Sequence, residues 1–102
     1  MYDPVWRPIP GTGQNLNITT TVTTSTAVGS QTYAVRLTAT GNCHVQFGNA
    51  TTAAPTVVNL QKETLVKSTD ISQVFACSPG DKVYVVQDGA ATGNLQIQEM
   101  TH

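Results

Sequence analysis

Apolar and polar residues alternate most regularly over residues 33–48, which read YAVRLTATGNCHVQFG. Successive side chains of a strand point to opposite faces, so each half of this stretch has one apolar face. The halves flank Gly41-Asn42, and two alternating runs around such a pair are typical of a β-hairpin. The apolar positions are Tyr33, Val35, Leu37 and Ala39 in the first run, and Cys43, Val45 and Phe47 in the second.

The register of this hairpin follows from the two apolar faces. A two-residue loop at Gly41-Asn42 would put Arg36 on the apolar face. A three-residue loop over residues 40–42 instead pairs Leu37 with Val45 and keeps all the apolar residues on one face. We therefore predict the longer loop. The residues then expected on the outer face are Arg36, Thr38, His44 and Gln46.

Strand patterns continue along the rest of the chain. Residues 16–28 alternate and are rich in β-branched residues, mostly Thr, which predicts a strand. Residues 82–87, KVYVVQ, are apolar on both faces, which predicts a central strand. A strong turn is expected at Ser78-Pro79-Gly80-Asp81. Shorter strands are predicted at residues 56–60, 64–68, 72–77 and 94–100.

Seven or eight short antiparallel strands with no helical periodicity predict an all-β fold, specifically a β-sandwich or jelly-roll-like domain. This domain is expected to span residues 15–102. The residues predicted to form its core are Val22, Val35, Leu37, Val45, Phe47, Phe75, Val83, Val85, Leu95 and Ile97.

Residues 1–14 differ from the rest and predict an extended, Pro-rich N-terminal arm. Its three prolines remove backbone donors and favour extended geometry. Its large apolar residues are unusual in a disordered tail, so we expect the arm to dock on a surface. That surface is either its own domain or, in the functional interpretation, another subunit or a larger assembly. The apolar residues are Tyr2, Val5, Trp6 and Ile9.

Composition narrows the class of partner. Charged residues make up 11% of the chain, against about 25% in an average domain, and no Lys/Arg cluster exists to bind nucleic acid. No apolar run is long enough to span a membrane, and the N-terminus lacks signal-peptide order, so we expect folding in the cytosol. Cys43 and Cys77 lie on apolar strand faces and are interpreted as buried free thiols, with a disulfide as the alternative.

Catalytic patterns are not found. Nucleophilic catalysis needs a positioned His, and the candidates are His44, interpreted as a solvated or subunit-contacting strand residue, and the terminal His102. The carboxylates mostly lie in predicted turns, so we expect no enzyme activity, no metal and no cofactor. Tyr84 is the one strand aromatic expected to be able to face outward, as a sugar-binding platform requires.

Three segments together resemble small virion proteins of tailed bacteriophages. They are Val35 to Gly48, with VRLTAT and CHVQFG around a two-residue break, the turn and strand from Ser78 to Val86, and the closing GNLQIQEMT from Gly93 to Thr101. The resemblance covers residues 33–101.

This resemblance implies a capsid decoration (cement) protein. Such a protein binds the major capsid protein on the outside of the head, often as a homotrimer, after assembly in the host cytoplasm. The alternatives are a head-fibre, tail or baseplate component, or a carbohydrate-binding β-module. The residues expected to contact partners are Tyr2, Val5, Trp6, Ile9, Arg36, His44 and Gln46.

Overall fold

The computed structural model describes residues 7–49, 54–69 and 73–101. Within these ranges the chain forms nine strands and one short helix. They are β1 (Arg7–Pro8), β2 (Gln14–Ile18), β3 (Thr23–Thr24), β4 (Ala34–Ala39), β5 (Cys43–Gly48), α1 (Val57–Leu60), β6 (Thr64–Val66), β7 (Gln73–Ala76), β8 (Lys82–Gln87) and β9 (Gly93–Thr101).

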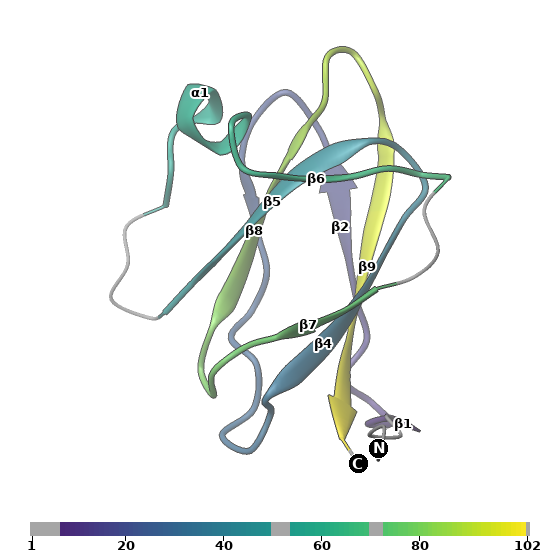
Figure 1. The fold of residues 1–102 in the computed structure, drawn as a ribbon, viewed down its shortest axis with the longest axis vertical. Helices are drawn as coiled ribbons and strands as arrows, with labels where there is room; N and C mark the ends of the chain where they lie inside the picture. Colours follow the sequence, from purple (N-terminus) through teal and green to yellow (C-terminus); the bar gives the residue numbers. More distant parts are fainter. Residues whose placement is uncertain (1–6, 50–53, 70–72, 102) are drawn as a thin grey trace, which may run out of the picture.

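The strands form two antiparallel sheets (Figure 1), so the predicted all-β class is confirmed. The first sheet has the order β1-β9-β4-β7, and β2 also pairs with β9. The second sheet has the order β3-β8-β5-β6. The strand predicted to be central, β8, lies between β3 and β5. Its residues Val83 to Val86 are all buried.

The pairings are nested along the chain. β5 pairs with β6, β4 with β7, β3 with β8 and β2 with β9, which is the pairing of one long hairpin doubled back between β5 and β6. Two further pairings, β4 with β9 and β5 with β8, join successive layers of this hairpin. The long hairpin is therefore divided between the two sheets and rolled up on itself.

One apolar core lies between the sheets. The first sheet contributes residues of β2, β4 and β9, and the second contributes residues of β5, β6 and β8. Seven of the ten predicted core residues are buried there, while Phe47 and Phe75 pack against it half-buried and Val22 joins a separate cluster. The core residues that the sequence analysis did not include are Leu16, Ile18, Val28, Ala39, Cys43 and Val66.

The predicted hairpin over residues 33–48 is wrong. β4 pairs with β9 and β7, and β5 pairs with β8 and β6, so the two strands lie in different sheets. Leu37 therefore lies opposite Ile97 and Gln73, and Val45 lies opposite Val85 and Thr64. Residues 40–42 form a corner between the sheets.

The faces of these strands were nevertheless predicted correctly. Val35, Leu37, Cys43 and Val45 all point into the core and are at most 2% exposed. Both strands must present an apolar face to the same core, whether they pair with one another or face one another across it. Alternation specifies that face and leaves the pairing partner open.

The region 16–28 contains a break that the pattern did not show. β2 ends at Ile18, and only Thr23–Thr24 resumes as a strand, in the other sheet. Between them the Thr19 hydroxyl accepts from the backbone N–H of Thr21 at 3.3 Å and lies 3.1 Å from the Thr21 carbonyl oxygen. Thr side chains that bond locally in this way compete with the strand ladder, which explains the corner.

The predicted strand at residues 56–60 is a helix. The Thr56 hydroxyl caps α1 by accepting from the backbone N–H of Asn59. Leu60 and Val57 then pack on Tyr84 and Val86, which lie on the outer face of β8. This tertiary contact overrides the preference of Val and Thr for strands.

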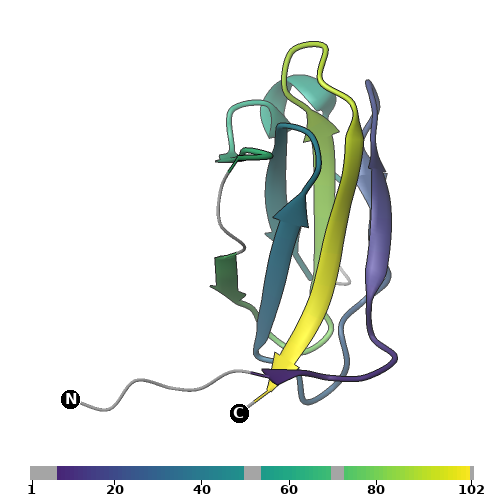
Figure 2. The ribbon, with the colours of Figure 1, turned by 90° about the vertical axis from the view of Figure 1, so that its right-hand side faces the viewer.

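Residues 7–13 lie against their own domain. β1 pairs with the C-terminal end of β9, and β2 pairs with the rest of the same edge (Figure 2). Between them Gln98 Nε2 donates to the carbonyl oxygen of Ile9 at 2.8 Å and to the Thr12 hydroxyl at 2.9 Å. Pro8 occupies an edge position, where its missing N–H is tolerated. The arm was expected to dock either on its own domain or on another subunit, and residues 7–13 dock on their own domain.

The corner at residues 40–42 packs tightly against the corner that precedes β9. A Cβ atom on Gly41 would lie 2.0 Å from the carbonyl oxygen of Thr92, and one on Gly93 would lie 2.7 Å from Thr40 Oγ1. Thr40 also donates its N–H to the Asn94 carbonyl at 2.9 Å, and Asn94 donates its N–H to Thr40 Oγ1 at 2.8 Å. Only glycine allows this approach.

We predict that Gly41→Ala lowers the free energy of unfolding by at least about 2 kcal/mol, because the new methyl group collides with backbone. Gly13→Ala is the matched control. A Cβ there would meet only the Oε1 atom of the Gln98 side chain, at 3.2 Å, and no backbone atom within 4 Å. Urea unfolding measures both variants. Equal midpoints for the two would contradict the close crossing of the corners.

Candidate functional site

The residues predicted to contact partners do not form one surface. Arg36 lies on the outer face of the first sheet, between Val74 and Gln98 on the neighbouring strands. His44 and Gln46 lie on the outer face of the second sheet. Tyr2, Val5 and Trp6 lie outside the described residues.

Arg36 is half-buried, and its Nε is buried without a hydrogen-bond partner. The neighbouring Val74 side chain is 41% exposed. The side chain of Gln98, on the other flank, donates to the segment of residues 9–12. Among the described residues, no acceptor satisfies this buried Nε of Arg36.

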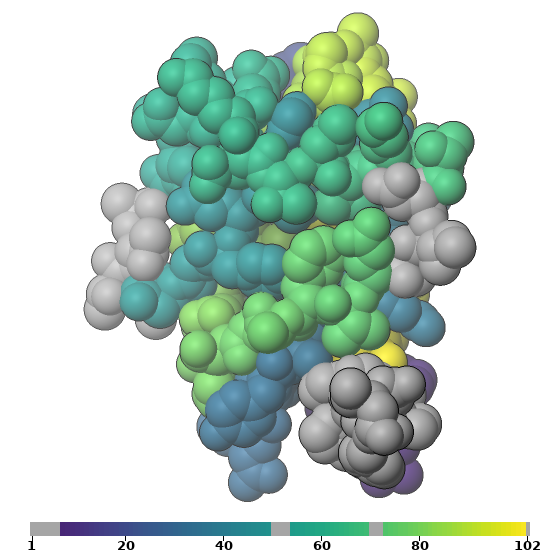
Figure 3. Space-filling view, viewed as in Figure 1, coloured from purple at the N-terminus to yellow at the C-terminus, as the bar shows by residue number. Residues whose placement is uncertain are grey.

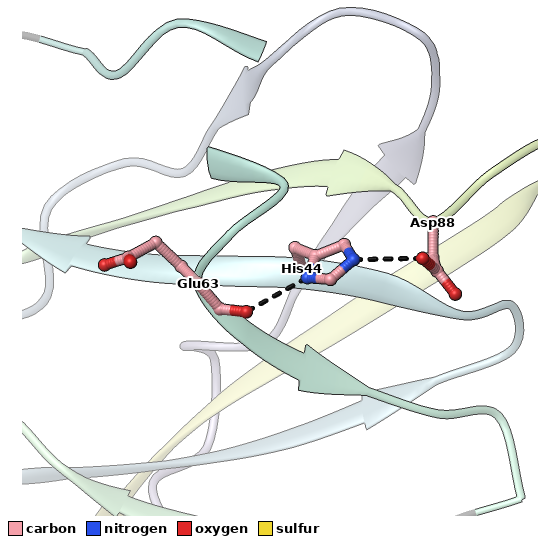
Figure 4. Close-up of polar contacts among 3 residues, drawn as sticks. All are labelled: His44, Glu63 and Asp88. Carbon is pink, nitrogen blue, oxygen red and sulfur yellow. Dashed lines mark hydrogen bonds and ion pairs between the residues drawn. The ribbon is translucent and has the colours of Figure 1, made fainter. Parts of the chain in front are cut away.

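His44 joins three parts of the second sheet (Figure 4). Its Nδ1 lies 3.0 Å from the carbonyl oxygen of Glu63, and its Nε2 lies 3.0 Å from Oδ1 of Asp88. A carbonyl oxygen and an ionised carboxylate both accept, so the two bonds form together when both ring nitrogens carry a proton. The ring connects β5 to the turn before β6 and to the end of β8.

This geometry corrects the interpretation of His44 as solvated, because its side chain is only 12% exposed. The side chain of Asp88, 41% exposed, lies nearer the solvent.

Asp81 does form the predicted turn, since its Oδ2 accepts from the N–H of Ser78 at 2.8 Å. Asp70 lies outside the described residues.

Tyr84 does not provide a platform for sugars. Its side chain is on the outer face of β8, as expected, but α1 covers it and leaves it 3% exposed. The exposed aromatic of the described domain is Tyr33, at 63%. The sequence pattern placed Tyr33 on the apolar face, and it lies just before β4, where the core ends.

Both cysteines are free thiols, as the sequence analysis favoured, and no disulfide joins them. Cys43 is buried as expected, whereas Cys77 is only half-buried. Burial raises the pKa of Cys43 to about 11, with a further contribution from the charge of Asp88. Burial also raises the pKa of Cys77 to about 11, with contributions from the charges of Asp81 and Glu99.

A pocket of about 490 Å³ opens at the end of the core, between residues 9–12, the turn of residues 29–32 and the end of β9. Glu99 lies in it and is 6% exposed. Its Oε1 accepts from the N–H of Gly29 at 3.0 Å and from the Thr32 hydroxyl. The sequence analysis missed this site, although Glu99 falls on the same strand face as Leu95 and Ile97. The sequence feature that could have indicated this site is an acidic residue at an otherwise apolar position of the strand pattern.

Within the described residues, no group of three or more His, Cys, Asp or Glu side chains is placed to hold a metal ion. Among the same residues, no helix is long and apolar enough to cross a membrane.

α1, β6 and β7 lie on the side of the molecule that Figure 3 shows. Each carries an exposed large apolar residue, Val58 in α1, Leu65 in β6 and Val74 in β7. Leu65 lies opposite His44 and Val74 lies opposite Arg36, so these two side chains are on the outer faces of different sheets. β6 and β7 are the last strands of their sheets and pair on one edge only within the described part of the chain. We call this the β6–β7 side.

Comparisons with protein-family models, with curated proteins and with solved structures each find no match.

We predict that His44→Ala lowers the free energy of unfolding by about 1–2 kcal/mol, because two acceptors lose their donor. Gln46→Ala is the matched control. Gln46 lies on the same outer face, is also half-buried, and its side chain makes no hydrogen bond to another described residue. Its truncation should change stability by less than about 0.5 kcal/mol. Urea unfolding at pH 6 distinguishes the two, and equal losses would contradict a specific role for the ring.

We also predict that both thiols react slowly with iodoacetamide at pH 8 in the folded protein and rapidly in denaturant, because the thiolate is the reactive form. A raised thiol pKa stabilises the fold fully below the unfolded value of about 9.0 and progressively less up to about 11.

The unfolding free energy should therefore fall between pH 9 and 11, and more steeply than in a variant with Cys43→Ala and Cys77→Ala. Tyr and Lys titrate in both proteins and cancel in this comparison. Parallel pH profiles, or labelling at pH 8 as fast as in denaturant, would show that the thiols are not desolvated.

Proposed function

We propose that this protein is a capsid decoration protein: a structural virion protein that binds the outside of a phage head and stabilises contacts between major capsid subunits. The proposal includes the fold type, which we infer to be a β-sandwich of the jelly-roll type. The observation that carries it is the nested strand pairing. A long hairpin divided between two sheets and rolled up on itself is the architecture of a jelly roll, and jelly rolls recur in viral capsid and lectin domains.

The resemblance of the three segments supports the same class. They include β4 and β5, the turn with most of β8, and β9. These strands occupy the inner positions of the two sheets, so the segments that resemble phage virion proteins also build most of the core.

The N-terminal segment is the proposed anchor on the capsid. Arg7 to Ile9 are held at the edge of β9, where the N–H of Ile9 donates to the carbonyl oxygen of Glu99 at 2.8 Å. Ile9 therefore contacts its own domain and tethers the segment. We assign the contact with the capsid to Tyr2, Val5 and Trp6. Full burial of Trp6 would remove about 200 Å² from water and contribute up to about 5 kcal/mol.

The β6–β7 side is the proposed surface for a homotrimer. Unpaired strand edges and exposed apolar side chains favour association, and both occur there in the described part of the chain. Arg36, His44 and Gln46 remain proposed contacts on the two outer faces.

Lectin domains also use jelly rolls, so a carbohydrate-binding module is the second candidate. The burial of Tyr84 under α1 weighs against it, because it removes the expected stacking platform. The capsid role is therefore preferred.

We predict that deleting residues 1–6 leaves a folded domain whose affinity for undecorated heads of the same phage falls at least tenfold. The truncation keeps β1, so it does not expose the edge of β9. Tyr33→Ala is the matched control, since it removes an exposed aromatic from the domain itself. It should change the affinity less than about threefold, which is below 0.7 kcal/mol. Cosedimentation with heads measures binding, and undiminished binding by the folded truncation would contradict the anchor.

A further inference from the structure

We propose that the Glu99 pocket binds a lysine or arginine side chain of the protein on which the domain docks. The identity of that protein as a capsid subunit rests on the proposed function. The preference of the pocket for a basic side chain does not, because it follows from the charge and burial of Glu99.

Glu99 is held in place before any ligand arrives. Its Oε1 accepts from both the N–H of Gly29 and the Thr32 hydroxyl. Those two donors belong to one turn, which the Thr32 N–H closes by donating to the carbonyl oxygen of Gly29 at 3.2 Å. Both bonds end on Oε1, and within the described part of the chain no donor bonds to Oε2. One oxygen thus orients the carboxylate, and the other is available to a ligand.

The charge of Glu99 lacks a cationic partner among the Lys and Arg residues of the chain. All five of them lie in the described ranges, and none forms an ion pair with Glu99. Arg36 lies opposite Gln98, next to Glu99 in strand register, but on the outer face of the sheet, and the exposed Arg7 lies opposite Thr101. Glu99 is nine-tenths buried and its donors in the described part of the chain are neutral. A cation brought to such a carboxylate interacts with it more strongly than with one at the open surface, because the surroundings have a lower dielectric constant.

The walls of the pocket suit the rest of a long basic side chain. Ile9 provides an apolar surface for the aliphatic stem, and the hydroxyls of Thr12, Ser30 and Thr101 are acceptors for the remaining N–H groups. A volume of about 490 Å³ accommodates a complete lysine or arginine side chain.

Other ligand classes fit less well. A divalent cation prefers several oxygen ligands with more than one carboxylate, and Glu99 is the only acidic residue that lines the pocket in the described part of the chain. No aromatic side chain among the described lining residues provides a stacking surface for a sugar.

The position of the pocket favours a protein as the source of the side chain. Ile9 and Thr12 follow directly from β1, so the pocket adjoins the place where the proposed anchor segment joins the domain. A subunit that engages the anchor therefore lies within reach of the pocket.

The test is an NMR titration of the labelled full-length protein with the capped peptides acetyl-Gly-Lys-Gly-amide and acetyl-Gly-Arg-Gly-amide. We expect saturable shifts of the Gly29, Thr32 and Glu99 amides with dissociation constants of about 1–10 mM, and no such shifts with acetyl-Gly-Gln-Gly-amide. Glu99→Gln, which keeps an acceptor for Gly29 and Thr32, should weaken binding at least tenfold. Glu63→Gln, at an exposed acid, should leave binding unchanged.

Three results would overturn the inference: no saturable shift up to about 20 mM peptide, the same shifts with the Gln peptide, or undiminished binding by Glu99→Gln. If Glu99→Gln does not fold, the comparison of the three peptides on the wild-type protein decides. Binding of Glu99→Gln to heads is a separate readout. If Glu99→Gln binds heads as well as the wild-type protein does, the capsid is not the source of the basic side chain. The result of deleting the anchor segment tests the proposed function alone and does not affect the peptide titration.

Discussion

Every long strand of this domain presents one face to a single core, and that requirement determines the rest of the structure. A chain of this size has apolar residues for one core, and residues from β2, β4, β5, β6, β8 and β9 fill it. Because the nested hairpin is divided between two sheets, the chain must cross the end of the core repeatedly. The crossings are short, and at Gly41 two of them leave no room for a side chain.

The same arrangement determines where chemistry is found. Polar side chains on the outer faces of β4 and β5 are separated by the full thickness of the domain, so Arg36 and His44 cannot act together. The end of the core is different, because the inward face of β9 continues past Ile97 to Glu99. Glu99 occupies the next inward-facing position, where the apolar core ends, so its carboxylate is buried beside a pocket. The turn of residues 29–32 supplies the hydrogen-bond donors to this carboxylate.

The outer face of the second sheet shows how local patterns are overridden. Tyr84 and Val86 give β8 a second apolar face, which must be covered to leave water. α1 provides that cover through Leu60 and Val57, and its Thr56 cap closes the first turn. Residues 56–60 contain two Val and a Thr, so their composition favours a strand, and only the packing partner explains the helix.

The sequence by itself determined the class of fold, the existence of most strands and the face that each strand turns toward the core. Side-chain alternation is a local property, and burial of apolar surface requires it whatever the partner strand is. Only the tertiary structure decided which strands pair, because a three-residue link such as residues 40–42 joins two strands of one sheet or of two. It also decided that both ring nitrogens of His44 face an acceptor, that Tyr84 is covered and that Glu99 faces a pocket. Each of these depends on residues far away in the chain, and alternation along a single strand carries no information about them.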